Sequence, residues 1–192
     1  SVGPWGRTYE LSKLGMPSRI ESQGEAVQAE PGRIVVVRRG KEILIPLKGG
    51  PRFTESKPYR VCFQGESRGA GLKLQAAGWV EQDGLVYVEL TYGPEKNAVT
   101  IDGLRLEYPL VGTWAESLVC IGPGANFSSK TAKLLPTAKA KPEGLLWSTL
   151  ETGRQGSGMT VGSFYPTVFI GGDRRGFLWW GDNDKGWFPD ND

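Results

Sequence analysis

The sequence of 192 residues contains no histidine. Catalytic triads that use histidine, histidine metal ligands and an imidazole general base are therefore excluded from this chain. Cysteine is scarce as well: the two residues are Cys62 and Cys120, and each lies in a run of alternating apolar residues. This setting predicts buried free thiols, with a single disulfide as the alternative.

Long apolar runs and a charge excess of one sign are also missing. No run approaches the ~20 apolar residues that a membrane-spanning helix needs, so we expect no membrane partner. The net charge is +2, and the lysines and arginines are scattered. Nucleic-acid binding typically needs a clustered basic excess, so we expect no nucleic-acid partner. The first residues lack the apolar core of a signal peptide, which fits a mature secreted chain or an excised piece of one.

Glycine and proline, by contrast, are abundant, with 28 and 13 residues. They separate short runs in which apolar and polar residues alternate, as in an antiparallel sheet with one buried face. Three turns stand between such runs, at Arg39-Gly40, Asp83-Gly84 and Asp102-Gly103, and each predicts a β-hairpin. The sequence therefore predicts an all-β fold, an antiparallel β-sandwich of the supersandwich type with two sheets and about ten to twelve strands.

Two segments lack this alternation. Residues 122–144 are rich in Ser, Ala, Lys, Gly and Pro, and Pro136 would end any helical turn there, so we predict a long loop. Residues 153–163 have a similar composition. Elsewhere, the aromatic residues Trp5, Tyr9 and Trp79 are predicted to lie in the core.

The stretch 171–188, GGDRRGFLWWGDNDKGWF, concentrates acidic, basic and aromatic residues. Asp182, Asp184 and Gly186 resemble part of a calcium loop, but the glycine stands at the wrong place and no helices flank the loop, so we expect no metal. With Asp173, the same aspartates are candidate carboxylates for glycoside hydrolysis by residue type alone. Turn formation explains them more simply, because Asp and Asn after a strand are common turn residues.

Two adjacent tryptophans in this stretch, Trp179 and Trp180, would point to opposite faces of a strand. We expect one of them to be buried with Phe177, and the other to be exposed for sugar stacking or for contact with another domain. Residues 173–187 are accordingly predicted to form a closing hairpin first and an interface second.

Four segments in one order carry a family resemblance: residues 5–31, residues 78–94, VTIDGLRLEYPL at 99–110 and PTVFIGGDRRGFLWWGDNDKGW at 166–187. They resemble the amino-terminal β-sandwich region of large bacterial proteins related to glycoside hydrolase family 123, whose members are β-N-acetylgalactosaminidases. The resemblance extends from Trp5 to Trp187. It implies that the chain is a single sandwich domain, residues 1–192, at the amino-terminal end of a larger protein.

The resemblance also implies where the chemistry lies. In that family a (β/α)8 barrel follows the sandwich, and an adjacent Asp-Glu pair there supports attack by the substrate's own acetamido group. This chain has no adjacent Asp-Glu pair, and its β pattern leaves no room for a barrel of ~250 residues. The resemblance therefore implies that the parent is a glycoside hydrolase, secreted or periplasmic, and that the chain itself is a noncatalytic scaffold, for which we expect no cofactor.

The partners implied are the carboxy-terminal catalytic barrel of the same polypeptide and an N-acetylhexosamine-containing glycan. The alternative is a free-standing carbohydrate-binding module that uses exposed tryptophans, with Trp114, Trp147 and Trp180 as candidates. No catalytic residue is expected. The residues predicted to lie near the substrate or the interface are Asp173, Arg175, Trp180, Asp184, Lys185 and Trp187.

Overall fold

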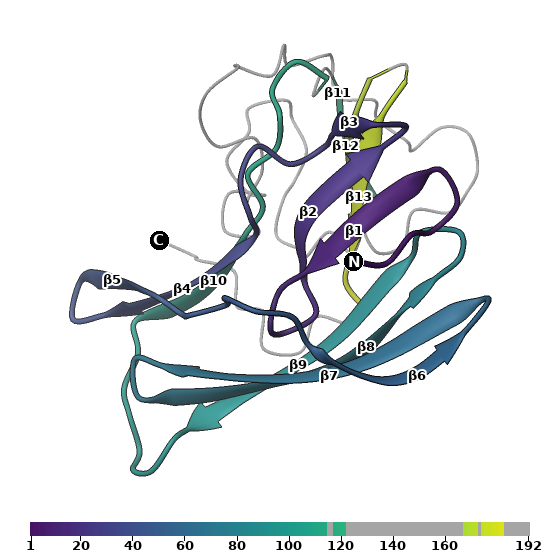
Figure 1. Ribbon diagram of the computed structural model, residues 1–192. Coiled ribbons are helices and arrows are strands. Elements are labelled where there is room, and N and C mark those ends of the chain that lie inside the picture. Colours follow the sequence, from purple (N-terminus) through teal and green to yellow (C-terminus); the bar gives the residue numbers. More distant parts are fainter. Residues whose placement is uncertain (115–116, 122–166, 173, 183–192) are drawn as a thin grey trace. The chain divides into compact units, whose positions relative to one another are not determined.

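The computed structural model describes residues 1–114, 117–121, 167–172 and 174–182, with the backbone alone for 117–121. The chain divides into two compact units, Ser1–Leu110 and Val111–Asp192, and each is described by itself. The described residues form strands and no helix (Figure 1). Within these ranges, accordingly, no helix has the length and apolar character needed to cross a membrane.

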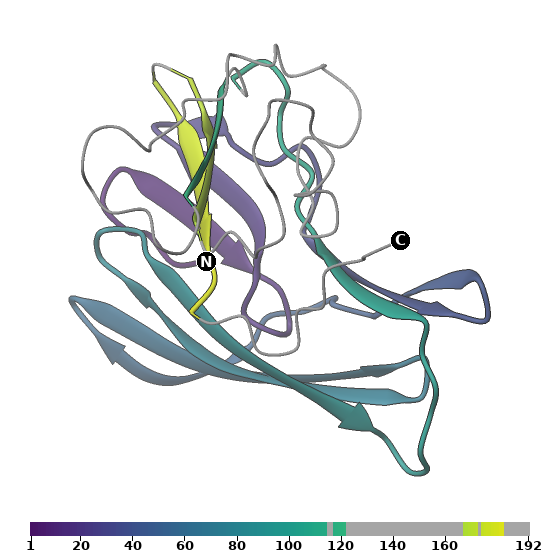
Figure 2. The same ribbon diagram turned by 180° about the vertical axis from the view of Figure 1, so that it is seen from behind.

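Unit 1 contains three antiparallel sheets, which Figures 1 and 2 show from opposite sides. The first comprises β1 (Arg7–Leu11), β2 (Pro17–Ser22) and β3 (Glu25–Ala26). The second has the order β10-β4-β5 and comprises β4 (Arg33–Arg38), β5 (Lys41–Leu44) and β10 (Gly103–Glu107). The third is the largest, with β6 (Arg52–Lys57), β7 (Arg60–Gly69), β8 (Leu72–Glu81) and β9 (Val86–Pro94) in that order.

Unit 2 contains one antiparallel sheet among its described residues, with the order β11-β12-β13. Its strands are β11 (Ser117–Ile121), β12 (Thr167–Gly171) and β13 (Gly176–Trp180). The all-β antiparallel prediction is confirmed, and the arrangement is consistent with a sandwich. The described strands are divided among four small sheets, where two were expected, because glycine- and proline-rich connections such as residues 46–51 interrupt the ladders.

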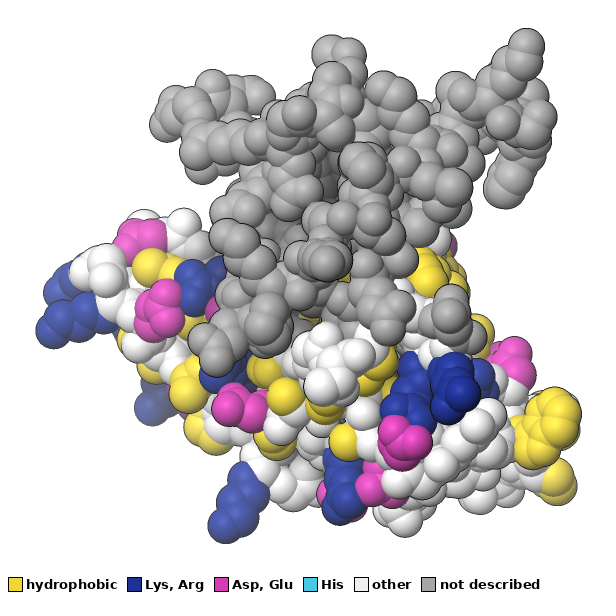
Figure 3. Space-filling view, turned by 90° about the horizontal axis from the view of Figure 1, so that it is seen from above, with side chains coloured by type: hydrophobic (Ala, Val, Ile, Leu, Met, Phe, Trp, Pro, Cys, Tyr) yellow, Lys and Arg dark blue, Asp and Glu magenta, His cyan; other side chains and the backbone are white. Residues whose placement is uncertain are grey.

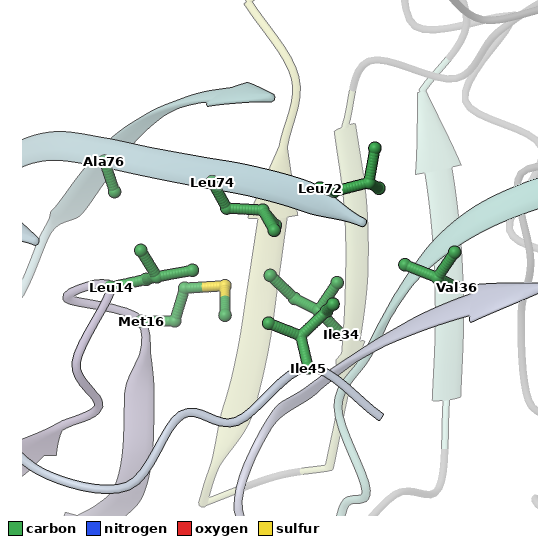
Figure 4. Close-up of a cluster of buried hydrophobic side chains, with 8 residues drawn as sticks. All are labelled: Leu14, Met16, Ile34, Val36, Ile45, Leu72, Leu74 and Ala76. Atoms are coloured by element: carbon green, nitrogen blue, oxygen red, sulfur yellow. The ribbon is translucent and has the colours of Figure 1, made fainter. Parts of the chain in front are cut away.

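The core of unit 1 lies on the inner face of the largest sheet. Alternate residues of β8 point into it, as period-2 patterning requires, and their neighbours point outward. Opposite them lie side chains from β4, from the residue after β5 and from the loop between β1 and β2 (Figure 4). The buried cluster comprises Leu14, Met16, Ile34, Val36, Ile45, Leu72, Leu74 and Ala76.

Phe63 on β7 is the largest fully buried side chain and is 1% exposed. Its ring packs against two glycines, which have no side chains to occupy that space. A Cβ added to Gly15 would lie 1.8 Å from the ring, and one added to Gly78 would lie 2.8 Å from it. Gly65, on the same strand, meets the backbone itself, because a Cβ there would lie 1.9 Å from the carbonyl oxygen of Lys13. The loop between β1 and β2 therefore packs directly on β7.

Two of the three predicted hairpins are confirmed. Arg39 and Gly40 join β4 to β5 with φ angles of 53° and 70°, the positive values that a type I′ turn needs. Asp83 and Gly84 join β8 to β9, and the Asp83 carboxylate accepts a hydrogen bond from the Leu85 amide at 3.0 Å. Local turn chemistry was sufficient to predict both.

The third predicted hairpin, at Asp102-Gly103, is wrong. Residues 99–101 form no strand, and β10 pairs with β4 in antiparallel register instead. The Asp102 amide donates to the Val37 carbonyl at 2.8 Å, and its carboxylate accepts from the Gly40 amide at 2.9 Å. Asp102 thus stabilises the turn between β4 and β5, and long-range pairing overrides the local signal.

β6 is an edge strand of the largest sheet, and all six of its residues are exposed. Its register with β7 shifts between Phe53 and Glu55, so the strand contains a bulge. Three of its side chains are charged: Arg52, Glu55 and Lys57.

Predictions for individual side chains had mixed outcomes. Tyr9 is buried as predicted, at 5% exposure, and Trp79 is half-buried. Trp5 was predicted to lie in the core and is 90% exposed, because it occupies a turn that projects from the chain and not a strand. Cys62 carries a free thiol but is half-buried, because it lies on the outer face of β7 beside Glu55. The predicted loop 122–144, segment 153–163 and the side chain of Cys120 lie outside the described residues.

Candidate functional site

Unit 2 contains a hairpin at residues 167–180; the hairpin predicted at 173–187 shares its second strand with this one, and residues 183–187 lie outside the described residues. β12 and β13 pair with Phe169 opposite Leu178 and Thr167 opposite Trp180. The Gly172 amide donates to the Arg175 carbonyl at 2.9 Å across the turn. Residues 167–180 therefore form a short antiparallel ladder.

The structure describes two of the six predicted site residues. Arg175 lies in the turn of the hairpin and is half-buried, whereas Trp180 ends β13 and is 43% exposed. Five residues of extended strand separate them by ~16 Å, so the hairpin does not bring these two together. The other four, Asp173, Asp184, Lys185 and Trp187, lie outside the described residues.

Side chains alternate along β13 as predicted for the two tryptophans. Phe177 and Trp179 are half-buried on one face, so Phe177 is less buried than expected for a core residue. The other face is exposed and apolar: Phe169 is 37% exposed, Leu178 60% and Trp180 43%. We call these three residues the hairpin face.

A pair of glycines holds the hairpin face in place. Gly171 lies opposite Gly176, and the Phe169 ring lies across both. A Cβ added to Gly176 would lie 2.2 Å from that ring, and one added to Gly171 would lie 2.5 Å from it. The exposed ring is therefore packed on backbone, which limits its freedom before any partner binds.

A second surface in unit 1 was not predicted from the sequence. Three turns meet at one end of the largest sheet: the Trp5 amide donates to the Gln82 carbonyl at 2.9 Å, and the Gln82 amide donates to the Tyr59 carbonyl at 3.0 Å. A guanidinium nitrogen of Arg7 donates to the Asp83 carbonyl at 2.5 Å. We call Trp5, Tyr59, Gln82 and Asp83 the turn end.

The turn end exposes two aromatic side chains, with Trp5 at 90% and Tyr59 at 53%. The Trp5 turn is closed by a hydrogen bond from the Arg7 amide to the Pro4 carbonyl at 3.0 Å, and Gly6 adopts a φ of 67°. Backbone hydrogen bonds thus fix the position from which the indole projects. In the sequence, the signal for these turns was the presence of glycine at residues 6 and 84, because glycine is common in tight turns. In the structure both glycines adopt positive φ angles.

A stack of side chains on the outer face of the sheet supports the turn end. The rings of Trp79 and Tyr87 stack with centroids 4.2 Å apart, and the Arg60 guanidinium lies 5.0 Å from the Trp79 centroid. Glu81 accepts hydrogen bonds from Arg60 at 2.5 Å and from the Trp79 indole at 3.0 Å. Arg60 and Glu81 are chain neighbours of turn-end residues, so this stack restrains the backbone beneath the exposed rings.

Two titratable groups of unit 1 near this region have shifted pKa values. Burial raises the pKa of Tyr9 above its ordinary value, and its hydroxyl donates to the Gly84 carbonyl at 2.9 Å. A hydrogen bond from Lys57 lowers the pKa of Glu55 below its ordinary value. Acidic and basic side chains are interspersed on the described surface in Figure 3. The described residues also contain no group of three or more Cys, Asp or Glu that could hold a metal ion.

A comparison with protein-family models identifies the family of the chain. Residues 1–153 match the family model described as glycoside hydrolase 123, third domain. The chain belongs to the glycoside hydrolase 123 family. Neither a curated protein nor a solved structure matches the chain.

The match covers all of unit 1 and residues 111–153 of unit 2. It confirms the resemblance to glycoside hydrolase 123 proteins that the sequence predicts. The β12–β13 hairpin lies beyond the matched range. Since the matching model is that of a third domain, the position of the chain at the amino-terminal end of a longer glycoside hydrolase 123 protein stays a prediction.

Proposed function

We propose that the chain is a noncatalytic β module of a glycoside hydrolase 123 protein, which packs on the (β/α)8 catalytic barrel of the same polypeptide and helps to shape the mouth of its active site. The observation that carries this proposal is the hairpin face, where three large apolar side chains stand exposed side by side. Contiguous apolar groups of this kind on a soluble module typically mark contact with another protein surface. A secreted or periplasmic location in a bacterium belongs to the same proposal.

The chemistry of the chain supports a noncatalytic role. Its sequence has no histidine and no adjacent Asp-Glu pair, the arrangement that supports substrate-assisted catalysis in the resembling enzymes. The family match to a domain that is third in its series supports a module within a larger protein. The hairpin face supplies the contact surface that such a module needs.

Further side chains, in the hairpin and in the residues after it, extend the proposed interface. Trp180 combines a large apolar ring with an indole N–H, which suits the core of an interface between domains. Arg175 lies at the turn of the same hairpin. With Asp173, Asp184, Lys185 and Trp187, they are the side chains that we assign to the barrel contact or to the mouth of the active site.

The alternative, a free-standing carbohydrate-binding module with Trp114, Trp147 and Trp180, has less support. Trp114 is 6% exposed and presents no ring face to a sugar. Trp147 lies outside the described residues, and Trp180 belongs to the hairpin face.

Docking is tested in a polypeptide that joins this chain to its catalytic barrel. Leu178→Asp places a charge in the proposed interface, where its desolvation is costly. We expect the module and the barrel to uncouple, so that a single calorimetric unfolding transition separates into two, and kcat/KM to fall. Leu44→Asp is the matched control, because Leu44 is 61% exposed and Leu178 60%. If both variants behave like the parent, or if both uncouple equally, the hairpin face is not the docking surface.

Catalysis by the chain alone is expected to be absent. Purified chain should not hydrolyse an aryl β-N-acetylgalactosaminide, because the carboxylate pair that performs this chemistry is missing from the sequence. Release of the chromogenic aglycone measures this directly. Turnover that Asp173→Asn or Asp184→Asn abolishes would contradict the noncatalytic assignment.

A further inference from the structure

We propose that the turn end is a second contact site for glycan, at which the exposed rings of Trp5 and Tyr59 pack against the apolar face of a pyranose unit in a neutral carbohydrate. This goes beyond the docking role, because the site is formed by residues of unit 1 alone and does not involve the hairpin face.

The aromatic side chains provide the main attraction. A pyranose ring presents a patch of C–H groups on one face, and the π face of an indole or phenol carries the negative part of the ring quadrupole. Stacking needs a ring that solvent can reach. Trp5 is 90% exposed and Tyr59 is 53% exposed, whereas Trp79 and Tyr87 are occupied with each other.

The polar groups around the rings suit sugar hydroxyls, which both donate and accept hydrogen bonds. Gln82 is exposed and its side-chain amide can do both. Asp83 contributes an exposed carboxylate, and the Arg7 guanidinium lies at the same turn. Polar groups placed beside an aromatic surface can fix the orientation of a bound ligand.

The turn end is also organised before a ligand arrives. Backbone hydrogen bonds join Trp5 to Gln82 and Gln82 to Tyr59. The ion pair between Arg60 and Glu81 and the aromatic stack hold the strand ends beneath them. Because little backbone freedom is lost on binding, weak stacking energy can produce measurable affinity.

The neighbours of the rings favour a glycan over a protein as the occupant. Gln82, Asp83 and Arg7 are polar or charged, so the two rings form no continuous apolar patch like the hairpin face. The family is one of glycoside hydrolases, so the ligand that such a module meets at its place of work is carbohydrate.

The test uses the whole 192-residue chain and two probes, methyl β-N-acetylgalactosaminide and methyl β-galactoside. Indole N–H signals are followed by NMR during titration, and the Trp5 signal is assigned by its loss in Trp5→Ala. We expect the Trp5 signal to move with a Kd of ~1–10 mM, the weak range in which binding contributes ~3–4 kcal/mol. Variants are compared through saturation transfer to the sugar's own proton signals, which does not depend on the Trp5 indole. Trp5→Ala and Tyr59→Ala should each weaken binding at least about tenfold, and Trp5→Phe should keep part of it.

Tyr92→Ala is the matched control, since Tyr92 is 58% exposed, comparable with Tyr59, but lies on β9 opposite Leu74 and away from the turn end, so its loss should leave sugar binding unchanged. Folding of each variant is checked by circular dichroism. The proposal is wrong if neither probe moves the Trp5 signal, or if binding persists in Trp5→Ala. Self-association that depends on Trp5, seen by sedimentation without sugar binding, would assign the turn end to a second copy of the chain and overturn the glycan assignment.

Discussion

Replacing Phe63 with alanine is expected to destabilise the chain by about 3–5 kcal/mol, the range for a large aromatic residue lost from a core. Phe63 is 1% exposed, and its ring fills the space that Gly15 and Gly78 leave open. These glycines cannot close the cavity, because they have no side chains to move into it. Urea unfolding followed by circular dichroism measures the loss.

The control for this change lies opposite it on the neighbouring strand. Phe53 pairs directly with Phe63 in the register of β6 and β7, but it is 47% exposed. Phe53→Ala removes the same atoms from a surface position and should cost about 1 kcal/mol or less. Equal losses from the two variants would show that Phe63 is not the packing centre of the largest sheet.

Gly65→Ala is expected to cost about 3 kcal/mol or more, although it adds one methyl group. The new carbon would lie 1.9 Å from the Lys13 carbonyl oxygen, and a backbone atom cannot rotate away as a side chain can. The loop between β1 and β2 would have to lift from β7. This loop contributes Leu14 to the core, so the effect should spread to core packing.

Gly93→Ala on β9 tests whether glycine replacement as such is harmful. An added Cβ there meets nothing within 4 Å, so the variant should be neutral or slightly stabilising through reduced freedom of the unfolded chain. Midpoints of urea unfolding compare the two variants. A Gly65→Ala chain as stable as Gly93→Ala would mean that the loop does not pack on the strand as described.

Local chemistry made the fold class and two turns predictable. Arg39 and Gly40 adopt the positive φ angles of a tight turn, and the Asp83 carboxylate accepts a hydrogen bond from the amide two residues later. Neither interaction depends on distant parts of the chain. Asp102-Gly103 presents the same local signal, yet its partner strand β4 begins 70 residues earlier, at Arg33. Such a pairing follows from the shared core and not from the turn, so alternation of apolar residues could not reveal it.

The site was harder to predict for a related reason. Hydrophobicity places tryptophan in a core by default, but Trp5 projects from a turn whose amide is held by Gln82, 77 residues later. Trp114 shows the opposite failure, because it was a candidate for sugar stacking and is buried. The alternation of Trp179 and Trp180 could be predicted, since it follows from strand geometry alone.

The bulge in β6 has a consequence for the protein in solution. An edge strand carries backbone groups that can pair with the edge of another molecule, which is the first step of intermolecular sheet growth and aggregation. In β6, the shift between Phe53 and Glu55 breaks the regular spacing of those groups, and the charged side chains Arg52, Glu55 and Lys57 would have to give up water if a second edge paired there. The open side of the largest sheet therefore lacks the regular, uncharged edge from which intermolecular sheet growth starts.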